Sequence, residues 1–163
     1  MNPAWATPLN IPGLPNFAQV SPTLYRGAQP LGGLFAPDGL GHLEAMAVRT
    51  VVNLEMFSLS ERLFAWAYCL QYVGISCKPW HPEMEDVRKF LAVVRDPDSD
   101  PVFVHCRQGA DRTGIMCAVY RIAIQSWSKM DAIDEMVNGG WGFHGDLYPE
   151  IVPFIQALDV KTL

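Results

Sequence analysis

Positive charge and long apolar runs are both scarce in this 163-residue sequence. Lys and Arg together number 12 against 17 Asp and Glu, the formal net charge is −5, and no basic cluster occurs. Because nucleic acids and anionic membrane surfaces are bound mainly through basic clusters, neither is an expected partner. No apolar run approaches the roughly 18 residues of a membrane-spanning helix, so no membrane insertion is expected. With 50% hydrophobic and 18% charged residues, the composition is typical of a globular domain.

Metal-binding patterns are also missing. The four cysteines, at positions 69, 77, 106 and 117, form no C-x-x-C pair, and the histidines show no paired spacing. No metal and no other cofactor is therefore expected. Cys69, Cys77 and Cys117 fall within helix-like or strand-like patterns, and we expect them to be small core residues. Cys106 is the exception, because it lies in a polar loop.

The N-terminal segment is rich in proline and has neither the basic start nor the apolar core of an export signal. We expect residues 1–23 to form an extended arm on a domain that spans 24–163. The expected location is the cytoplasm if the chain is complete, and the periplasm if a signal peptide was removed. The sequence does not indicate an oligomeric state.

Strand-like and helix-like patterns alternate from Leu24 onward. The expected strands are 24–28, 50–54, 75–79 and 101–105. The expected helices are 38–47, 60–73, 87–94, 115–123, 128–137 and 151–158. This alternation predicts an α/β fold, a single domain with a central, mostly parallel sheet of four to five strands flanked by helices. Arg26, in the first strand, is expected to be a buried structural cation without a role in the site.

The stretch PVFVHCRQGADRTGIMCAVYRIA (101–123) passes from an apolar strand through a polar loop into a helix. Such a loop presents backbone N–H groups to one point, at the positive end of the helix dipole, and so forms an anion site. Gly109 allows the tight curve, and Arg112 adds a planar cation suited to two phosphate oxygens. The same field favours the thiolate of Cys106, to which the Thr113 hydroxyl can donate. The pattern indicates a sulfur nucleophile aimed at a bound oxyanion.

The loop HCRQGADRTG resembles the H-C-x5-R-[ST]-G signature of the cysteine-dependent protein tyrosine and dual-specificity phosphatases, most of all the compact bacterial enzymes, some of them periplasmic. The likeness extends to LYRGAQP, YRIAIQSWS and EMVNGGWG, and so covers about 24–142. The resemblance implies attack by Cys106 on phosphorus, a phosphocysteine intermediate and metal-free hydrolysis. His105 would orient the loop. The phosphate-binding residues would be Arg107, Gln108, Gly109, Ala110, Asp111 and Arg112, through their backbone amides and the Arg112 guanidinium.

The general acid is open among three carboxyl groups. In larger family members an Asp after Trp-Pro donates the proton, whereas the comparable loop here reads WHPEMED. Glu83 is the first candidate and Asp86 the second, although acids are favoured at a helix N-terminus in any case. Asp111 is the third, because myotubularin-like lipid phosphatases use an Asp at the matching position. Asp111 could equally hold Arg112 in place.

The expected function is hydrolysis of phosphoproteins or small phosphomonoesters, with phosphotyrosine preferred and phosphoserine or phosphothreonine also accepted. One alternative is an inositol phosphate or phosphoinositide phosphatase, but Arg107 and Asp111 cancel within the loop and the whole chain is acidic. A rhodanese-type sulfurtransferase is a second alternative, although typical rhodanese loops are shorter and lack the Arg-Thr pair. A catalytically dead phospho-binding module is the third, and the presence of both Cys106 and Arg112 argues against it.

Overall fold

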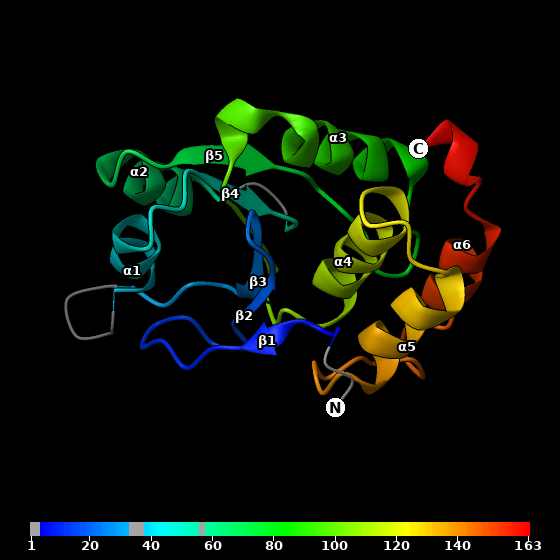
Figure 1. Ribbon diagram of the computed structural model, residues 1–163. Helices are drawn as coiled ribbons and strands as arrows, with labels where there is room; N and C mark the ends of the chain where they lie inside the picture. Colours follow the sequence, from blue (N-terminus) through cyan, green and yellow to red (C-terminus); the bar gives the residue numbers. More distant parts are fainter. Residues whose placement is uncertain (1–3, 33–37, 56–57) are drawn as a thin grey trace.

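The strands form one mixed sheet of six, in the order β1-β2-β3-β6-β4-β5 (Figure 1). The structure is a computed structural model and describes residues 4–32, 38–55 and 58–163. The strands are β1 Thr7–Pro8, β2 Ala18–Ser21, β3 Leu24–Ala28, β4 Thr50–Asn53, β5 Gln71–Gly74 and β6 Val102–Cys106. Strands β3, β6, β4 and β5 run parallel, whereas β1 and β2 are antiparallel to their neighbours. The expected α/β fold with a mostly parallel sheet is confirmed.

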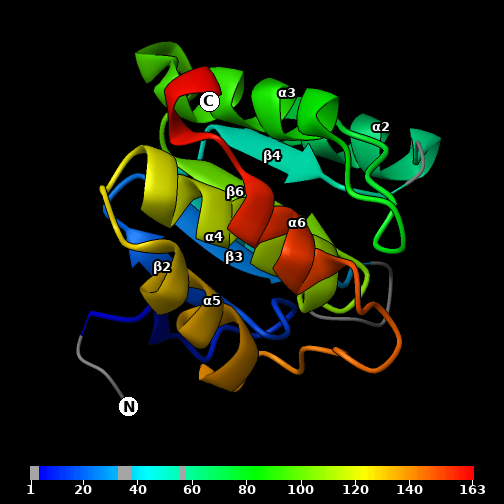
Figure 2. The ribbon, with the colours of Figure 1, turned by 90° about the vertical axis from the view of Figure 1, so that its right-hand side faces the viewer.

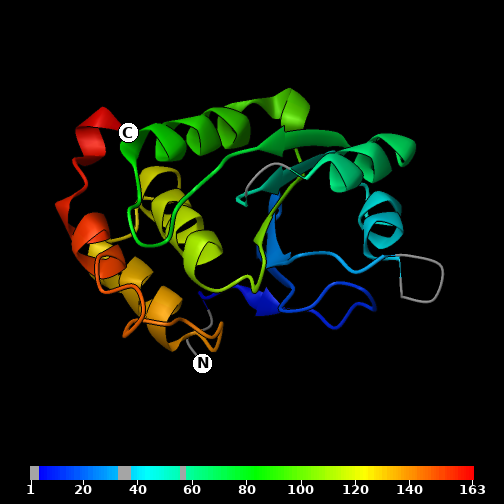
Figure 3. The ribbon, with the colours of Figure 1, turned by 180° about the vertical axis from the view of Figure 1, so that it is seen from behind.

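Helices cover both faces of this sheet. The α-helices are α1 Gly39–Ala45, α2 Leu59–Ala67, α3 Met84–Arg95, α4 Asp111–Ala123, α5 Lys129–Asn138 and α6 Ile151–Ala157, and short 3-10 turns occupy Pro97–Ser99 and Val160–Thr162. α1 and α2 pack on one face, and α3 and α4 on the other (Figures 1 and 3). α5 and α6 pack against α4 from the outside (Figure 2). Among the described residues, no helix is long and apolar enough to cross a bilayer.

Strand β6 is the centre of the fold. Its five residues are all buried, and it pairs in parallel with β3 on one side and β4 on the other. Val102, Val104 and Cys106 face the core beneath α3 and α4, and Phe103 faces the core beneath α1 and α2. An apolar run buried on both faces is what a central parallel strand requires. The carboxyl ends of β3, β6 and β4 therefore meet at one edge, where Cys106 ends its strand.

The segment 1–23 is more than an arm, because it contributes β1 and β2 to the sheet. This contribution gives six strands where four to five were expected. Phe17, Ala18 and Val20 are buried in the domain core, and β2 pairs directly with β3 across the position expected as the domain boundary. The sequence did not predict these antiparallel strands, because strands of two and four residues are too short to show an alternating pattern.

Three further expectations were wrong in the region between β4 and α3. The predicted helix 60–73 ends at Ala67, because Cys69 takes a positive φ of 57° that no helix can continue through. The chain therefore turns early, and the strand paired with β4 is β5, Gln71–Gly74, instead of 75–79. Cys69 lies exposed at this turn and is not a core residue, whereas Cys77 and Cys117 are buried as expected.

A buried ion pair joins the helical layer to the N-terminal strands. Arg121 of α4 donates from Nε and Nη2 to the two carboxylate oxygens of Glu135 of α5, each at 2.7 Å, and both side chains are almost fully buried. Arg121 also donates to the Val20 carbonyl oxygen at 3.0 Å, and the Ala6 N–H donates to Glu135. Removing one partner would leave a buried charge uncompensated.

We therefore expect Glu135→Ala to lower the free energy of unfolding by about 3–5 kcal/mol, as measured by urea denaturation at neutral pH. The matched control is Glu85→Ala, which breaks the exposed Lys89–Glu85 pair at 3.7 Å and should change stability by less than about 1 kcal/mol. Equal losses in the two variants would contradict the role assigned to the buried pair.

Candidate active site

The predicted phosphate loop lies at the carboxyl edge of the parallel strands, between β6 and α4. A cavity of about 380 Å³ opens above it, lined by Pro79, Cys106, Arg107, Gln108, Asp111, Arg112 and Tyr148. Five of these seven residues were predicted from the sequence, and Gly109 and Ala110 complete the loop behind them. Cys106 is 3% exposed and ends β6, so it lies at the strand end and not within the loop proper. Tyr148, from the segment before α6, was not predicted.

The carbonyl oxygens of loop residues 107–109 are each held by a hydrogen bond from outside the loop. The Gln29 N–H donates to the first at 3.4 Å, Asn16 Nδ2 to the second at 2.9 Å, and Arg26 Nη2 to the third at 2.7 Å. In a planar trans peptide the N–H of the next residue points opposite to the carbonyl. The N–H groups of residues 108–110 are therefore directed away from these three donors.

The loop amides are available to a ligand. In the described part of the chain, no acceptor takes a hydrogen bond from the backbone N–H groups of residues 107–110. α4 begins at Asp111 directly after them, so the positive end of its dipole adds to their field. Converging N–H groups at a helix start favour a bound anion. This geometry agrees with the oxyanion site expected from the sequence.

Gly109 has to be glycine for two independent reasons. Its φ is +70°, a conformation that disfavours side chains, and a Cβ would lie 2.5 Å from backbone atoms of Gly27. The loop thus packs directly on strand β3, and the close approach lets Arg26 reach the Gly109 carbonyl.

Arg26 has a role at the site that the sequence did not reveal. It is 1% exposed, and its guanidinium carbon lies 4.3 Å from the ring centroid of Trp141, a cation–π contact. Burial lowers the pKa of Arg26 from its ordinary value, and neighbouring thiols, including Cys106, act in the opposite direction. The buried Arg26 guanidinium therefore lies in the electrostatic neighbourhood of the Cys106 sulfur. An arginine in a strand-like run gives no sequence signal of such a contact.

Arg112 is held by the two residues that follow β4 and not from within the loop. Its Nη2 lies 3.2 Å from Glu55 Oε1 and its Nη1 3.4 Å from the Leu54 carbonyl oxygen. Asp111, which could have held Arg112, instead accepts hydrogen bonds from the backbone N–H of His144 at 2.8 Å and contacts its Nδ1 at 2.9 Å. Asp111 therefore fastens the segment that carries Tyr148 to the phosphate loop.

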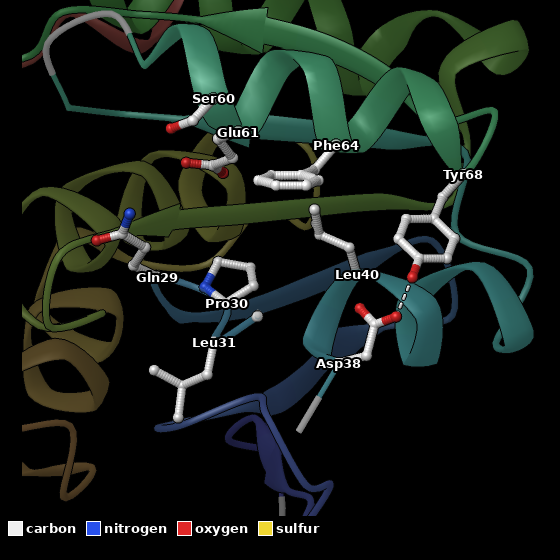
Figure 4. A pocket seen from close by; sticks show the side chains of 10 residues that line it. Gln29, Pro30, Leu31, Asp38, Leu40, Ser60, Glu61, Phe64 and Tyr68 are labelled. Carbon is white, nitrogen blue, oxygen red and sulfur yellow. Dashed lines mark hydrogen bonds between the residues drawn. The ribbon is translucent and has the colours of Figure 1, made fainter. Parts of the chain in front are cut away.

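His105 and Thr113 lie buried behind the cavity. His105 Nε2 is 2.6 Å from Glu61 Oε1 of α2, and its Nδ1 has no hydrogen-bond partner among the described residues. Glu61 also borders a second cavity, of about 470 Å³ and lined in part by Leu40 and Phe64 (Figure 4). The Thr113 hydroxyl is buried without a partner in the described chain, so the expected donation to Cys106 is not made in this structure.

Neither Glu83 nor Asp86 lines the cavity above the phosphate loop, although both follow Pro79, which does. Glu83 is the N-cap residue of α3 but makes no capping hydrogen bond, and its half-exposed carboxylate lies 3.3 Å from Lys78 Nζ. Asp86 is buried in the first turn of α3, and this burial raises its pKa from the ordinary value. In the described ranges, no group of three or more His, Cys, Asp or Glu side chains is placed to hold a metal ion.

Comparisons with known proteins agree with this geometry. Residues 13–139 match the family described as DSP-PTPase phosphatase fused to NAD+ kinase. The chain is 32% identical over 166 residues to the dual specificity protein phosphatase TpbA of Pseudomonas aeruginosa, with 99% of this chain and 70% of that protein covered. It is 30% identical over 127 residues to the inositol diphosphatase DSP4 of Arabidopsis thaliana, with 74% and 61% covered.

The fold comparison points the same way. The crystal structure of P. aeruginosa TpbA matches with a TM-score of 0.82 and 28% identity, with 99% of this chain and 94% of that chain covered. A cysteine-to-serine variant of TpbA in complex with pTyr matches equally well. The protein therefore belongs to the dual-specificity branch of the cysteine-dependent protein tyrosine phosphatases and is a phosphatase.

Proposed function

We propose that the protein hydrolyses phosphotyrosine in protein substrates, and accepts phosphoserine and phosphothreonine as well, through a phosphocysteine formed on Cys106. The observation that supports this proposal best is the outward anchoring of the carbonyls of residues 107–109, which leaves their neighbouring amides for a phosphate next to the sulfur. TpbA, which covers nearly the whole chain, is a dual specificity protein phosphatase whose variant has been seen with pTyr.

The proposed chemistry proceeds in two displacements. The Cys106 thiolate attacks phosphorus, the P–O bond to the substrate breaks, and the leaving oxygen takes a proton from the general acid. Water then attacks the phosphocysteine, the S–P bond breaks, and inorganic phosphate leaves while the acid regains a proton. The loop amides and the Arg112 guanidinium hold the equatorial oxygens in both steps.

Glu83 is the proposed general acid. It is accessible on the loop that also carries Pro79 into the cavity wall, and it is not used to cap α3. Asp111 is less suited, because both of its oxygens are engaged by His144. Asp86 is the second candidate, since its raised pKa keeps a proton on the carboxyl group to higher pH than usual.

Hydrolysis of inositol phosphates is the second candidate function, because DSP4 is named an inositol diphosphatase. The cavity charge argues against it. Arg107 and Arg112 are the two cations among the lining residues, and Arg112 already pairs with Glu55. A polyanionic substrate would find few partners there. Membership of a phosphatase family leaves the sulfurtransferase alternative without support. The presence of both Cys106 and Arg112 in the cavity wall argues against an inactive module.

Cys106→Ser should retain binding of a phosphotyrosine peptide while its turnover falls by several orders of magnitude, since the nucleophile alone is removed. Calorimetric titration and phosphate release measure the two properties. Cys69→Ser is the matched control, because Cys69 is exposed and absent from the cavity wall, and it should behave as wild type. Faster hydrolysis of inositol phosphates than of the peptide by the wild type would overturn the proposed substrate class.

The pH dependence of kcat/KM for an aryl phosphate should be bell-shaped, with its basic limb set by the general acid. Glu83→Gln should lose that limb, whereas Asp86→Asn and Asp111→Asn should keep it. Loss of the limb in Asp86→Asn alone would assign the acid to Asp86, and an unchanged profile in Glu83→Gln would exclude Glu83.

Iodoacetamide at pH 7 should alkylate Cys106, and inorganic phosphate should protect it by occupying the same loop. Burial raises the pKa of Cys77 to about 12, so this residue stays a thiol and should not react. Cys69 is exposed and lies outside the cavity wall, so its alkylation rate should not change when phosphate is added, and it serves as the internal control. Mild peroxide should likewise oxidise Cys106 before the other three cysteines. Peptide mass spectrometry gives the sites, and modification of Cys77 ahead of Cys106 would contradict the assignment.

A further inference from the structure

A continuous chain of hydrogen bonds links the residue before Cys106 to Arg112. Its first link is the contact between His105 Nε2 and Glu61 Oε1 at 2.6 Å, made by a fully buried imidazole and a carboxylate that is 7% exposed. The mechanism above uses neither Glu61 nor the two residues that link it to Arg112, Asn53 and Glu55. A buried carboxylate needs compensating hydrogen bonds, and the other oxygen of Glu61, Oε2, accepts one from the next residue of the series.

Asn53, the last residue of β4, is the middle of this chain. Its Nδ2 donates to Glu61 Oε2 at 2.8 Å, and its Oδ1 accepts from the backbone N–H of Glu55 at 2.7 Å. The side chain is fixed in this orientation, because a flipped amide would place its oxygen against the carboxylate and its NH₂ against an N–H donor. Asn53 is 2% exposed and lies opposite His105 in the β4–β6 register.

Glu55 completes the chain at the other catalytic group. Its carboxylate accepts from Arg112 Nη2 at 3.2 Å, while its backbone is tied to Asn53. The main chain between them runs alongside, since the Leu54 N–H donates to the His105 carbonyl and the Leu54 carbonyl accepts from Arg112 Nη1. The carboxyl end of β4 therefore contacts both ends of the phosphate loop.

The residue type at position 53 matters for this arrangement. An aspartate there would set a second carboxylate against Glu61, and an apolar side chain would leave Glu61 Oε2 and the Glu55 N–H unpaired in a buried site. The Asn53 amide supplies the donor to Glu61 and the acceptor for the Glu55 N–H from one side chain.

We propose that Asn53 and Glu61 are positioning residues that couple the orientation of His105, and with it Cys106, to the placement of Arg112 through Glu55. This inference rests on the proposed phosphatase mechanism and goes beyond it. Neither residue touches the substrate. Their part is to keep the nucleophile at one end of the loop and the cation at the other in a common geometry.

The test is reciprocal, because coupling between two groups acts in both directions. The Glu61 carboxylate makes two hydrogen bonds, to His105 and to Asn53, and Glu61→Gln breaks one of them. Although this change lies far from Arg112, it should raise the inhibition constant of inorganic phosphate by about threefold or more. Glu55→Gln weakens the hold on Arg112, and it should slow iodoacetamide alkylation of Cys106 by a similar factor. In the double variant the two effects on kcat/KM should deviate from their product by about threefold or more.

Tyr72→Phe is the matched control. Tyr72 lies on β5 and its hydroxyl accepts from Asn53 Nδ2 at 3.1 Å, so it contacts the same amide but lies off the path to either catalytic group. Combined with Glu55→Gln, it should give effects that simply multiply. Thermal unfolding of each variant separates loss of fold from loss of coupling.

Two results would overturn the coupling. In the first, Glu61→Gln leaves phosphate inhibition unchanged. In the second, the Glu61 and Glu55 effects multiply as the Tyr72 control does. The inhibition constant and kcat/KM are measured with an aryl phosphate, and Cys106 alkylation needs no turnover, so the coupling can be measured even if the protein fails to hydrolyse phosphotyrosine. Failure of the proposed substrate and failure of the coupling are thus read from different measurements.

Discussion

The site depends on the direction in which a short stretch of backbone points. A peptide loop carries as many carbonyl oxygens as N–H groups, and an unoriented loop would repel a phosphate as readily as it attracts one. Here Gln29, Asn16 and Arg26 hold three successive carbonyls on one side, so the amides face the other. The roles of the Cys106 sulfur and of the positive end of α4 depend on this direction of the amides.

Maintaining this polarity places a cation in the interior. Arg26 is buried, and its Nε has no hydrogen-bond partner in the described part of the chain. Burying a charge costs free energy unless other groups compensate for the lost hydration. The Gly109 carbonyl and the Trp141 ring compensate for part of the lost hydration. The same charge lies near the sulfur of Cys106 at the end of the neighbouring strand. A residue that supports the loop mechanically thus also contributes to the field in which the sulfur works.

The strand, loop and helix around Cys106 could be predicted from the sequence because their determinants are local. β6, the loop and α4 are consecutive, so one stretch of sequence predicts Cys106, Arg112 and the amides between them. It missed Asn16, Arg26, Glu55 and Glu61, because their contacts with the loop or its neighbours span between 44 and 92 residues of sequence. The strand at 71–74 was missed for a different reason. A positive φ at Cys69 cut the helix short, and an apolar period cannot reveal a single backbone angle.

The phosphate loop is supported from two sides by segments that are distant in the sequence. The N-terminal segment and β3 hold its carbonyls, while the end of β4 and α2 hold the residues at its two ends. A signature of ten residues can therefore be present in a chain that lacks the means to shape it. This dependence explains why similarity to TpbA over 99% of the chain, in sequence and in fold, says more about the activity than the signature alone. The supporting residues lie throughout that length, and the activity depends on the complete sheet that holds them.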